Sequence, residues 1–131
     1  MKQQKNLPAP TEGEFEILNI IWTLGPATVR QVHEELARKK PSQYTTTLKI
    51  MQIMSEKGLL SRDETDRSHV YQPTVQRDEV QQQMATKLMD RAFGGSAYSL
   101  LVGALGGRRT SKKELADLRK LIEDYEKGKK R

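Results

Sequence analysis

The sequence contains no cysteine among its 131 residues, which excludes disulfide bonds, thiolate zinc sites and a cysteine nucleophile. Its only histidines, His33 and His69, lie on different predicted elements with no third ligand at metal-binding spacing. We therefore expect neither a metal site nor a cofactor. No apolar run approaches the roughly 18 residues of a membrane-spanning helix, so we also expect no membrane insertion.

Signatures of catalysis are missing as well. The chain has no nucleophile elbow and no glycine-rich phosphate loop, and we predict that it is not an enzyme. The pairs Gly94-Gly95 and Gly106-Gly107 lie between short predicted helices and are interpreted as turns. Residues 1–10 are polar and lack the apolar core of a signal peptide. We expect them to form a flexible N-terminal arm on a cytoplasmic protein.

Positive charge is present in excess: the formal net charge is +6 and the isoelectric point is about 9.6. This balance favours a polyanionic partner, although ribosomal and membrane-surface proteins share it. The charge is unevenly placed, since residues 28–73 hold eight Lys/Arg against six Asp/Glu, whereas residues 77–131 hold thirteen against eight. Because residues 28–73 are only mildly basic, we expect this region to contact a polyanion at a few specific residues and not through a broad positive surface.

Two short helices are predicted at the start. Thr11 with Glu14 forms a capping-box pattern that starts a helix near residue 12, and Gly25-Pro26 ends it. Thr28 with Gln31 forms a second capping box, and the helix that follows stops before a proline. Both segments carry apolar residues at helical spacing, which indicates a buried face on each.

A third helix is predicted from a cap at Ser42 to a left-handed glycine, Gly58. Spacing residues at about 100° separates two faces on this helix. The core face holds Thr47, Ile50, Met51 and Met54. The opposite face holds Thr45, Lys49, Gln52 and Glu56, with Thr46 and Ile53 on one shoulder.

Residues 59–63 and 68–72 are then predicted to form two strands around a polar turn, with Leu60 and Val70 facing the core. Three helices followed by a hairpin are typical of a winged helix-turn-helix. We therefore predict a mainly α fold with a small β-hairpin wing, in which residues 11–74 form a DNA-binding domain.

Residues 75–131 are predicted to form three short helices and a charged tail. Each helix has one apolar side and too little partner surface in its own chain to build a core. The simplest completion is a second copy of the chain, so we predict a helical dimerisation region and a homodimer. The expected contact residues are Val80, Met84, Leu88, Phe93, Leu100, Leu101, Leu115, Leu118 and Ile122.

An ordered set of short motifs resembles the BlaI/MecI penicillinase-repressor family from about Thr11 to Tyr125. The motifs are Glu14 to Val29, Thr45-Thr46-Thr47 with Leu48, Met51 and Met54, Glu56 to Leu60, Arg67, His69 to Pro73, and Phe93 to Ser96. The resemblance implies a bacterial transcriptional repressor that binds an inverted-repeat operator as a dimer, in a β-lactam-resistance-like or related stress circuit. It also implies a sensor protease as a partner that relieves repression.

The chain departs from that family pattern at three places. Ile53 stands where the family usually has Arg, and Lys49 stands where it often has Thr. The β-lactam repressors are cut at an Asn-Phe bond, and the corresponding positions here hold Gly103-Ala104. The inducing signal therefore stays open.

Nine side chains are candidates for contact with double-stranded DNA. Thr45, Thr46, Lys49 and Gln52 carry groups that reach base edges and phosphates in a major groove. The competing interpretation of this face is an ordinary solvated helix surface. Arg62 and Arg67 bracket the wing, and Arg67 at its tip suits a phosphate or minor-groove contact. The competing interpretation is a surface charge that the carboxylates of Glu64 and Asp66 neutralise locally. Arg30, Ser42 and Tyr44 are further phosphate candidates, and Tyr44, like Trp22, also suits the edge of the core.

Two other functions remain open at this point. One is a winged-helix regulator gated by a small ligand, of the MarR or PadR sort, for which the short C-terminal region leaves little room. The other is a protein-interaction adaptor that does not bind DNA.

Overall fold

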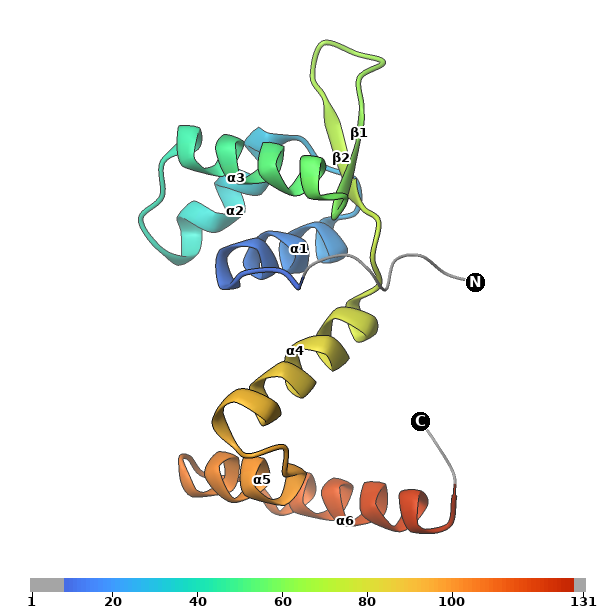
Figure 1. Ribbon diagram of the computed structural model, residues 1–131. Helices are drawn as coiled ribbons and strands as arrows, with labels where there is room; N and C mark the ends of the chain where they lie inside the picture. Colours follow the sequence, from blue (N-terminus) through green and yellow to red (C-terminus); the bar gives the residue numbers. More distant parts are fainter. Residues whose placement is uncertain (1–8, 129–131) are drawn as a thin grey trace. The chain divides into compact units, whose positions relative to one another are not determined.

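The computed structural model describes residues 9–128, which form two compact units that divide between Ala85 and Thr86. The first unit contains α1 (Glu12–Leu24), α2 (Val29–Lys39), α3 (Tyr44–Lys57), β1 (Leu60–Asp63), β2 (Val70–Pro73) and the first turns of α4 (Arg77–Ala92) (Figure 1). The second unit contains the rest of α4, α5 (Ala97–Gly106) and α6 (Lys112–Glu126).

The first two helices begin where their capping boxes predict. Thr11 Oγ1 accepts from Glu14 N at 3.2 Å, and Glu14 Oε1 accepts from Thr11 N at 3.0 Å. Thr28 and Gln31 make the same reciprocal pair at α2, at 3.2 and 2.9 Å. These bonds satisfy backbone N–H groups that a helix start leaves without intrahelical partners. Both capping boxes are confirmed.

The start of α3 differs from the prediction. Gln43 is the N-cap residue, without a side-chain capping bond, whereas Ser42 Oγ donates to Lys40 O at 3.2 Å. Ser42 is therefore not the cap, because its hydroxyl is used inside the turn between α2 and α3. The other end is confirmed: Gly58 closes α3 in the left-handed conformation, at φ 90° and ψ 8°.

The core of the first unit lies between the three helices and the hairpin. Helix α1 packs against α2, α3 and β2, and α3 also packs against β1. Met51 and Met54 point from α3 into this core and have no exposed surface. Their partners are Ile17, Leu18, Ile20, Ile21, Ala27, Val29, Val32, Leu36, Leu59, Leu60 and Tyr71.

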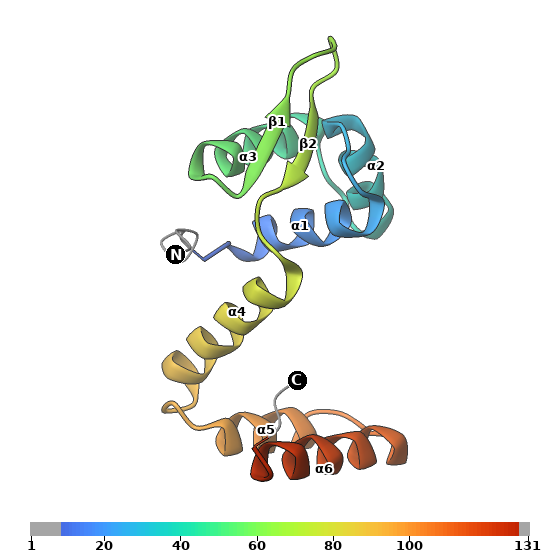
Figure 2. The ribbon, with the colours of Figure 1, turned by 90° about the vertical axis from the view of Figure 1, so that its right-hand side faces the viewer.

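The antiparallel hairpin β1–β2 forms the wing, and Figure 2 shows its loop projecting beyond α1, α2 and α3. Its register pairs Leu60 with Pro73 and Arg62 with Tyr71. Directly paired residues share a face, and successive residues of a strand point to opposite faces, so Tyr71, two positions from Pro73, accompanies Leu60 into the core. The prediction that Val70 faces the core with Leu60 is therefore wrong, because Val70 lies on the other face. A bridge between Ala27 and Tyr71 adds a third backbone segment beside β2.

The first unit extends past the expected boundary at residue 74. Trp22 Nε1 donates to Val75 O at 3.1 Å, and the Arg77 guanidinium lies 5.4 Å from the centre of the Trp22 ring. Val80, in the next turn of α4, is only 2% exposed. Val80 is therefore buried within one chain, and its side chain is not available as the exposed dimer contact that the sequence suggested.

The second unit has little interior of its own. The Ser96 and Ser111 hydroxyls cap α5 and α6 by accepting from Ser99 N and Glu114 N, both at 3.0 Å. No residue of α5 or α6 is buried within the chain. In the described part of the sequence, no helix combines the length and apolar character needed to cross a bilayer.

Candidate nucleic-acid interface

The polar face of α3 is open to solvent. Thr45, Thr46, Lys49 and Gln52 are all exposed, whereas Thr47, Met51 and Met54 on the opposite face are buried. Because the helix is held by its apolar back, the four polar side chains project together from one rigid element. Ile53 lies beside them and is 39% exposed. The structure thus brings together the central group of candidates that the sequence predicts.

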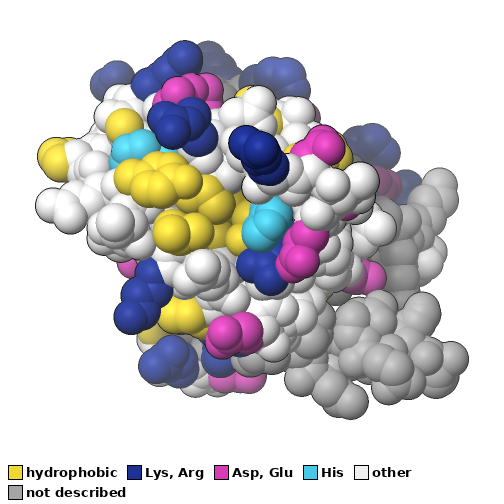
Figure 3. Space-filling view, turned by 90° about the horizontal axis from the view of Figure 1, so that it is seen from above, with side chains coloured by type: hydrophobic (Ala, Val, Ile, Leu, Met, Phe, Trp, Pro, Cys, Tyr) yellow, Lys and Arg dark blue, Asp and Glu magenta, His cyan; other side chains and the backbone are white. Residues whose placement is uncertain are grey.

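Figure 3 views the molecule from above, the side toward which the wing projects. Lys and Arg side chains surround an exposed apolar patch on this face and are interspersed with acidic side chains. The positive charge is therefore distributed at separate points. This agrees with the modest excess of basic residues in residues 28–73.

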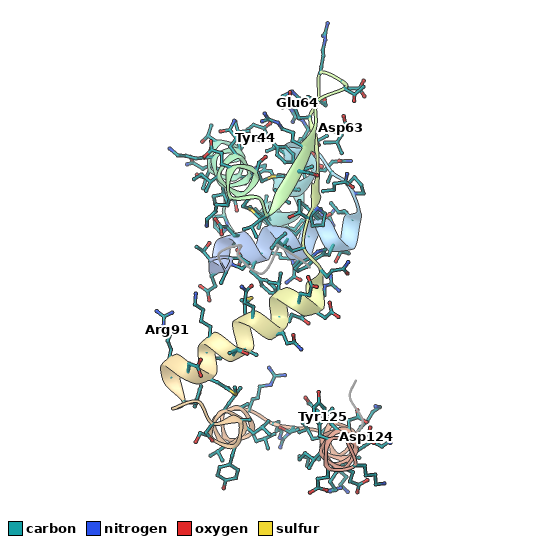
Figure 4. The ribbon with its side chains drawn as sticks, turned by 45° about the vertical axis from the view of Figure 1, so that its right-hand side comes forward. Tyr44, Asp63, Glu64, Arg91, Asp124 and Tyr125 are labelled. Carbon is teal, nitrogen blue, oxygen red and sulfur yellow. The ribbon has the colours of Figure 1, made fainter. Side chains whose placement is uncertain are left out.

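A polar and aromatic cluster joins α2 to the start of α3. The Arg30 guanidinium lies 5.9 Å from the centre of the Tyr44 ring, and the His33 ring meets Tyr44 edge-on at 5.7 Å. Tyr44, labelled in Figure 4, is 40% exposed. Arg30 therefore joins the α3 surface through Tyr44, which is a surface residue at the edge of the core.

His33 was not among the predicted site residues, yet it helps to set the angle between α2 and α3. Its Nδ1 lies 3.3 Å from Thr47 Oγ1, and the Thr47 hydroxyl donates to Gln43 O at 3.4 Å. Because the hydroxyl has a single hydrogen, Nδ1–H of His33 is the donor to Thr47 in this arrangement. The sequence alone gave no signal for this contact, because His33 and Thr47 lie on different helices and meet only when α2 packs against α3.

The N-terminus of α3 offers backbone donors. Gln43 provides no side-chain cap; Thr46 N and Thr47 N donate to Gln43 O, which leaves the N–H groups of Tyr44 and Thr45 for an external acceptor. Helix N-termini attract anions through these groups and through the helix dipole. Ser42 is half-buried in the preceding turn, and its Oγ remains engaged with Lys40 O.

The two wing arginines differ in their surroundings. Arg62 Nε donates to Glu64 Oε2 at 2.6 Å, and Tyr71 and Glu64 beside it raise the pKa of Arg62 above its usual value. Arg67 lies exposed in the loop and forms no ion pair with a described residue. The same loop is shaped by Asp63, which accepts from the Thr65 hydroxyl and from Thr65 N; these bonds lower the pKa of Asp63.

The expected dimerisation residues other than Val80 are at least partly accessible in the single chain. Leu88 and Ile122 are 48% and 50% exposed, and Leu115 is 37% exposed. The half-buried members are Met84, Phe93, Leu100, Leu101 and Leu118. Tyr98 and Val102 on α5 and Tyr125 on α6 are further exposed apolar residues that the predicted set omitted.

The chain is similar to known transcriptional regulators over most of its length. The family model described as penicillinase repressor matches residues 10–124. A "Transcriptional regulator BlaI" of Mycobacterium tuberculosis is 32% identical over 117 residues, which are 88% of this chain and 83% of the relative. A "Penicillinase repressor" of Bacillus licheniformis is 21% identical over 126 residues, covering 96% of this chain and 98% of the relative.

A solved structure confirms the fold of the first unit. The solution structure of the DNA-binding domain of the repressor BlaI matches with a TM-score of 0.51 and 23% identity, over 60% of this chain and 93% of that one. The α1–α2–α3 arrangement with its hairpin is thus a winged helix, as the order of elements predicted. Together with the family match over residues 10–124, these findings show that the chain belongs to the penicillinase repressor family of transcriptional regulators, which are not enzymes.

Proposed function

We propose that the protein is a dimeric transcriptional repressor that binds duplex DNA by placing the exposed face of α3 in the major groove. The observation that carries this proposal is the projection of Thr45, Thr46, Lys49 and Gln52 from a helix whose opposite side is anchored in the core. An α-helix fits the width of the major groove, where each base pair presents a distinct pattern of donors and acceptors.

The chemistry of the α3 face suits base reading. The Gln52 amide can pair with adenine through two hydrogen bonds, and the Lys49 ammonium can reach guanine or a phosphate. Methyl groups of Thr45 and Thr46 can meet the methyl group of thymine. Ile53 offers no cation at a position beside this face, so we expect one phosphate or base contact fewer there, and Lys49 in place of threonine should change the operator preference.

Phosphate contacts would flank this face. The open N-terminus of α3 and the Tyr44 hydroxyl are positioned at one end of the helix, with Arg30 next to Tyr44. Arg67 in the wing loop supplies a cation on the other side. Such contacts carry no sequence information but fix the register of a protein on the duplex. We assign this role to Arg30, Tyr44 and Arg67; the Ser42 hydroxyl would first have to release Lys40 O before it could donate to a phosphate.

The exposed apolar surface of the second unit supports the proposal of a dimer. Helices α5 and α6 bury none of their residues within the chain. The apolar side chains of Val102, Ile122 and Tyr125 are 54%, 50% and 56% exposed. A second copy would cover these side chains and would present two α3 helices to half-sites about 34 Å apart, one helical turn of DNA. An inverted-repeat operator matches that twofold arrangement. Such a regulator would act in the cytoplasm.

A sensor protease as partner stays a prediction. Gly103 and Ala104, which correspond to the family's cleavage site, lie inside α5, and the Phe93 ring lies against Gly103. The Asn-Phe pair is absent, so relief of repression by cleavage at this bond has no support from these two residues.

Salt dependence tests the central proposal. Affinity for a duplex recovered by genome-wide pull-down should fall with a log–log slope of about −0.9 for each phosphate contact. An adaptor would show no tight duplex binding at moderate salt, and that result would reject DNA binding. A regulator gated by a small ligand would bind DNA but release it when the low-molecular-weight fraction of a cell extract is added.

A further inference from the structure

The wing contains an arginine, Arg62, that already forms an ion pair with a carboxylate of the same hairpin. Arg62 reaches Glu64 Oε2 through both Nε, at 2.6 Å, and Nη2, at 2.5 Å. These two nitrogens form the side of the guanidinium that binds carboxylates and phosphates with paired hydrogen bonds. The pair lies at the surface, since the side chains of Arg62 and Glu64 are 33% and 52% exposed. A phosphate approaching this side of Arg62 therefore competes with Glu64 for the same donors.

The other charged residues of the wing do not restore the positive charge that Glu64 neutralises on Arg62. Asp63 is held by Thr65 at the start of the loop, and Asp66 forms no ion pair with a described residue. Arg67 is the other cation of the loop. Figure 4 labels Asp63 and Glu64 near the loop end of the hairpin. Without the Arg62–Glu64 pair, the segment from residue 62 to 67 holds one cation, Arg67, against the two carboxylates of Asp63 and Asp66.

We propose that Glu64 is an internal competitor for DNA phosphate, which withholds Arg62 from the nucleic acid and lowers sequence-independent affinity. This rests on the proposed DNA-binding function and adds a residue that sets its strength. A neutral Arg62–Glu64 pair releases no counterions from DNA, whereas a free Arg62 would act as one more phosphate contact. Weak sequence-independent binding favours specificity, because a genome offers a large excess of non-operator sites.

The test measures binding of the full chain to mixed-sequence duplex DNA over a range of salt concentrations. Glu64→Gln should steepen the log–log salt slope by about 0.9 and tighten binding by roughly threefold or more at low salt. Asp66→Asn is the matched control, because it removes the same charge from the same loop without freeing an arginine. Its effect should be clearly smaller.

A double-mutant cycle isolates the pair. In an Arg62→Gln background, Glu64→Gln should produce no more than the change caused by Asp66→Asn. Unchanged thermal midpoints would show that every variant is folded. The proposal is overturned if Glu64→Gln and Asp66→Asn act equally, if the effect of Glu64→Gln persists without Arg62, or if Glu64→Gln weakens binding. Absence of duplex binding by the unmodified protein at low salt would instead reject the proposed function itself, and with it this inference.

Discussion

Among single residues, Lys49 and Gln52 make distinguishable contributions to the proposed DNA contact. Both are exposed on α3 and neither packs in the core. Lys49→Ala and Gln52→Ala should each weaken operator binding by about 1–3 kcal/mol, as expected for side chains that contact bases or phosphates. If Gln52 reads a base, its loss should also relax the preference at one operator position.

Fluorescence anisotropy on duplexes recovered by pull-down would measure both effects. Gln81→Ala, an exposed substitution on α4 outside the α3 face, is the control and should leave the affinity unchanged. Unaltered affinity in both α3 variants would show that this face does not contact DNA.

An ion pair with a buried carboxylate is a second residue-scale feature, and it joins the start of α1 to the end of α3. Glu14 is 4% exposed, and its carboxylate accepts from Lys57 Nζ at 2.8 and 2.9 Å. Lys57→Met would leave that carboxylate without its cation. We expect a loss of about 2–3 kcal/mol in the free energy of unfolding. This is at or below the loss that follows when a fully buried ion pair is broken, because the Lys57 side chain is 30% exposed and water already screens part of its charge.

Urea unfolding of the full chain would measure this loss. The matched control is Lys113→Met, whose partner Asp117 lies 2.9 Å away on an exposed surface with side chains 83% and 64% exposed. Exposed pairs contribute little, so the control should change stability by less than about 1 kcal/mol. Equal losses in the two variants would contradict a special role for Glu14 and Lys57.

Among the elements, the junction between β2 and α4 depends on one indole. Trp22 contacts Phe15 edge-on at 6.0 Å and donates through Nε1 to Val75 O. Trp22→Phe keeps an aromatic ring but removes the donor, leaving the Val75 carbonyl without this partner. We expect a loss of about 1 kcal/mol in stability, because a typical hydrogen bond contributes that much net.

Hydrogen exchange locates the effect. Amides in the first turns of α4 should exchange faster in Trp22→Phe, while those of α2 should keep their protection. Tyr98→Phe, at a position that is 76% exposed on α5, is the control and should alter neither region. Uniformly faster exchange across the first unit would mean that Trp22 supports the whole core and not the junction in particular.

For the whole molecule, the exposed apolar side of α6 is expected to hold the dimer together. Leu115, Leu118, Ile122 and Tyr125 lie along one side of this helix, and Ala116 lies on the opposite side. Ile122→Glu should place a charge inside the proposed interface and shift the protein toward monomer. Sedimentation at micromolar concentration would report the mass.

Ala116→Glu adds the same charge away from the proposed interface and should leave the dimer intact. The monomeric Ile122→Glu variant should also lose affinity for an inverted repeat more than for a single half-site. A monomeric unmodified protein, or equal behaviour of the two variants, would exclude α6 as the dimer contact.

The sequence by itself determined most of the helix and strand assignments, and the physical reason is locality. The capping boxes at Thr11 and Thr28 and the left-handed Gly58 act within a few residues, so their patterns are readable without the fold. The periodicity of α3 likewise separated Met51 and Met54 from Lys49 and Gln52, because a helix converts spacing directly into faces. The candidate DNA face was therefore predictable in its central residues.

Only the tertiary structure decided the features that depend on residues brought together by folding. The pairing of Arg62 with Tyr71 placed Tyr71, and not Val70, in the core, since a shift of one residue exchanges the faces of a strand. Packing within the first unit buried Val80, and folding joined Glu14 to Lys57 across 43 positions of sequence. The sequence placed Glu64 and Asp66 close to both wing arginines, and the conformation of the hairpin decided that Glu64 pairs with Arg62, while Arg67 forms no ion pair with a described residue.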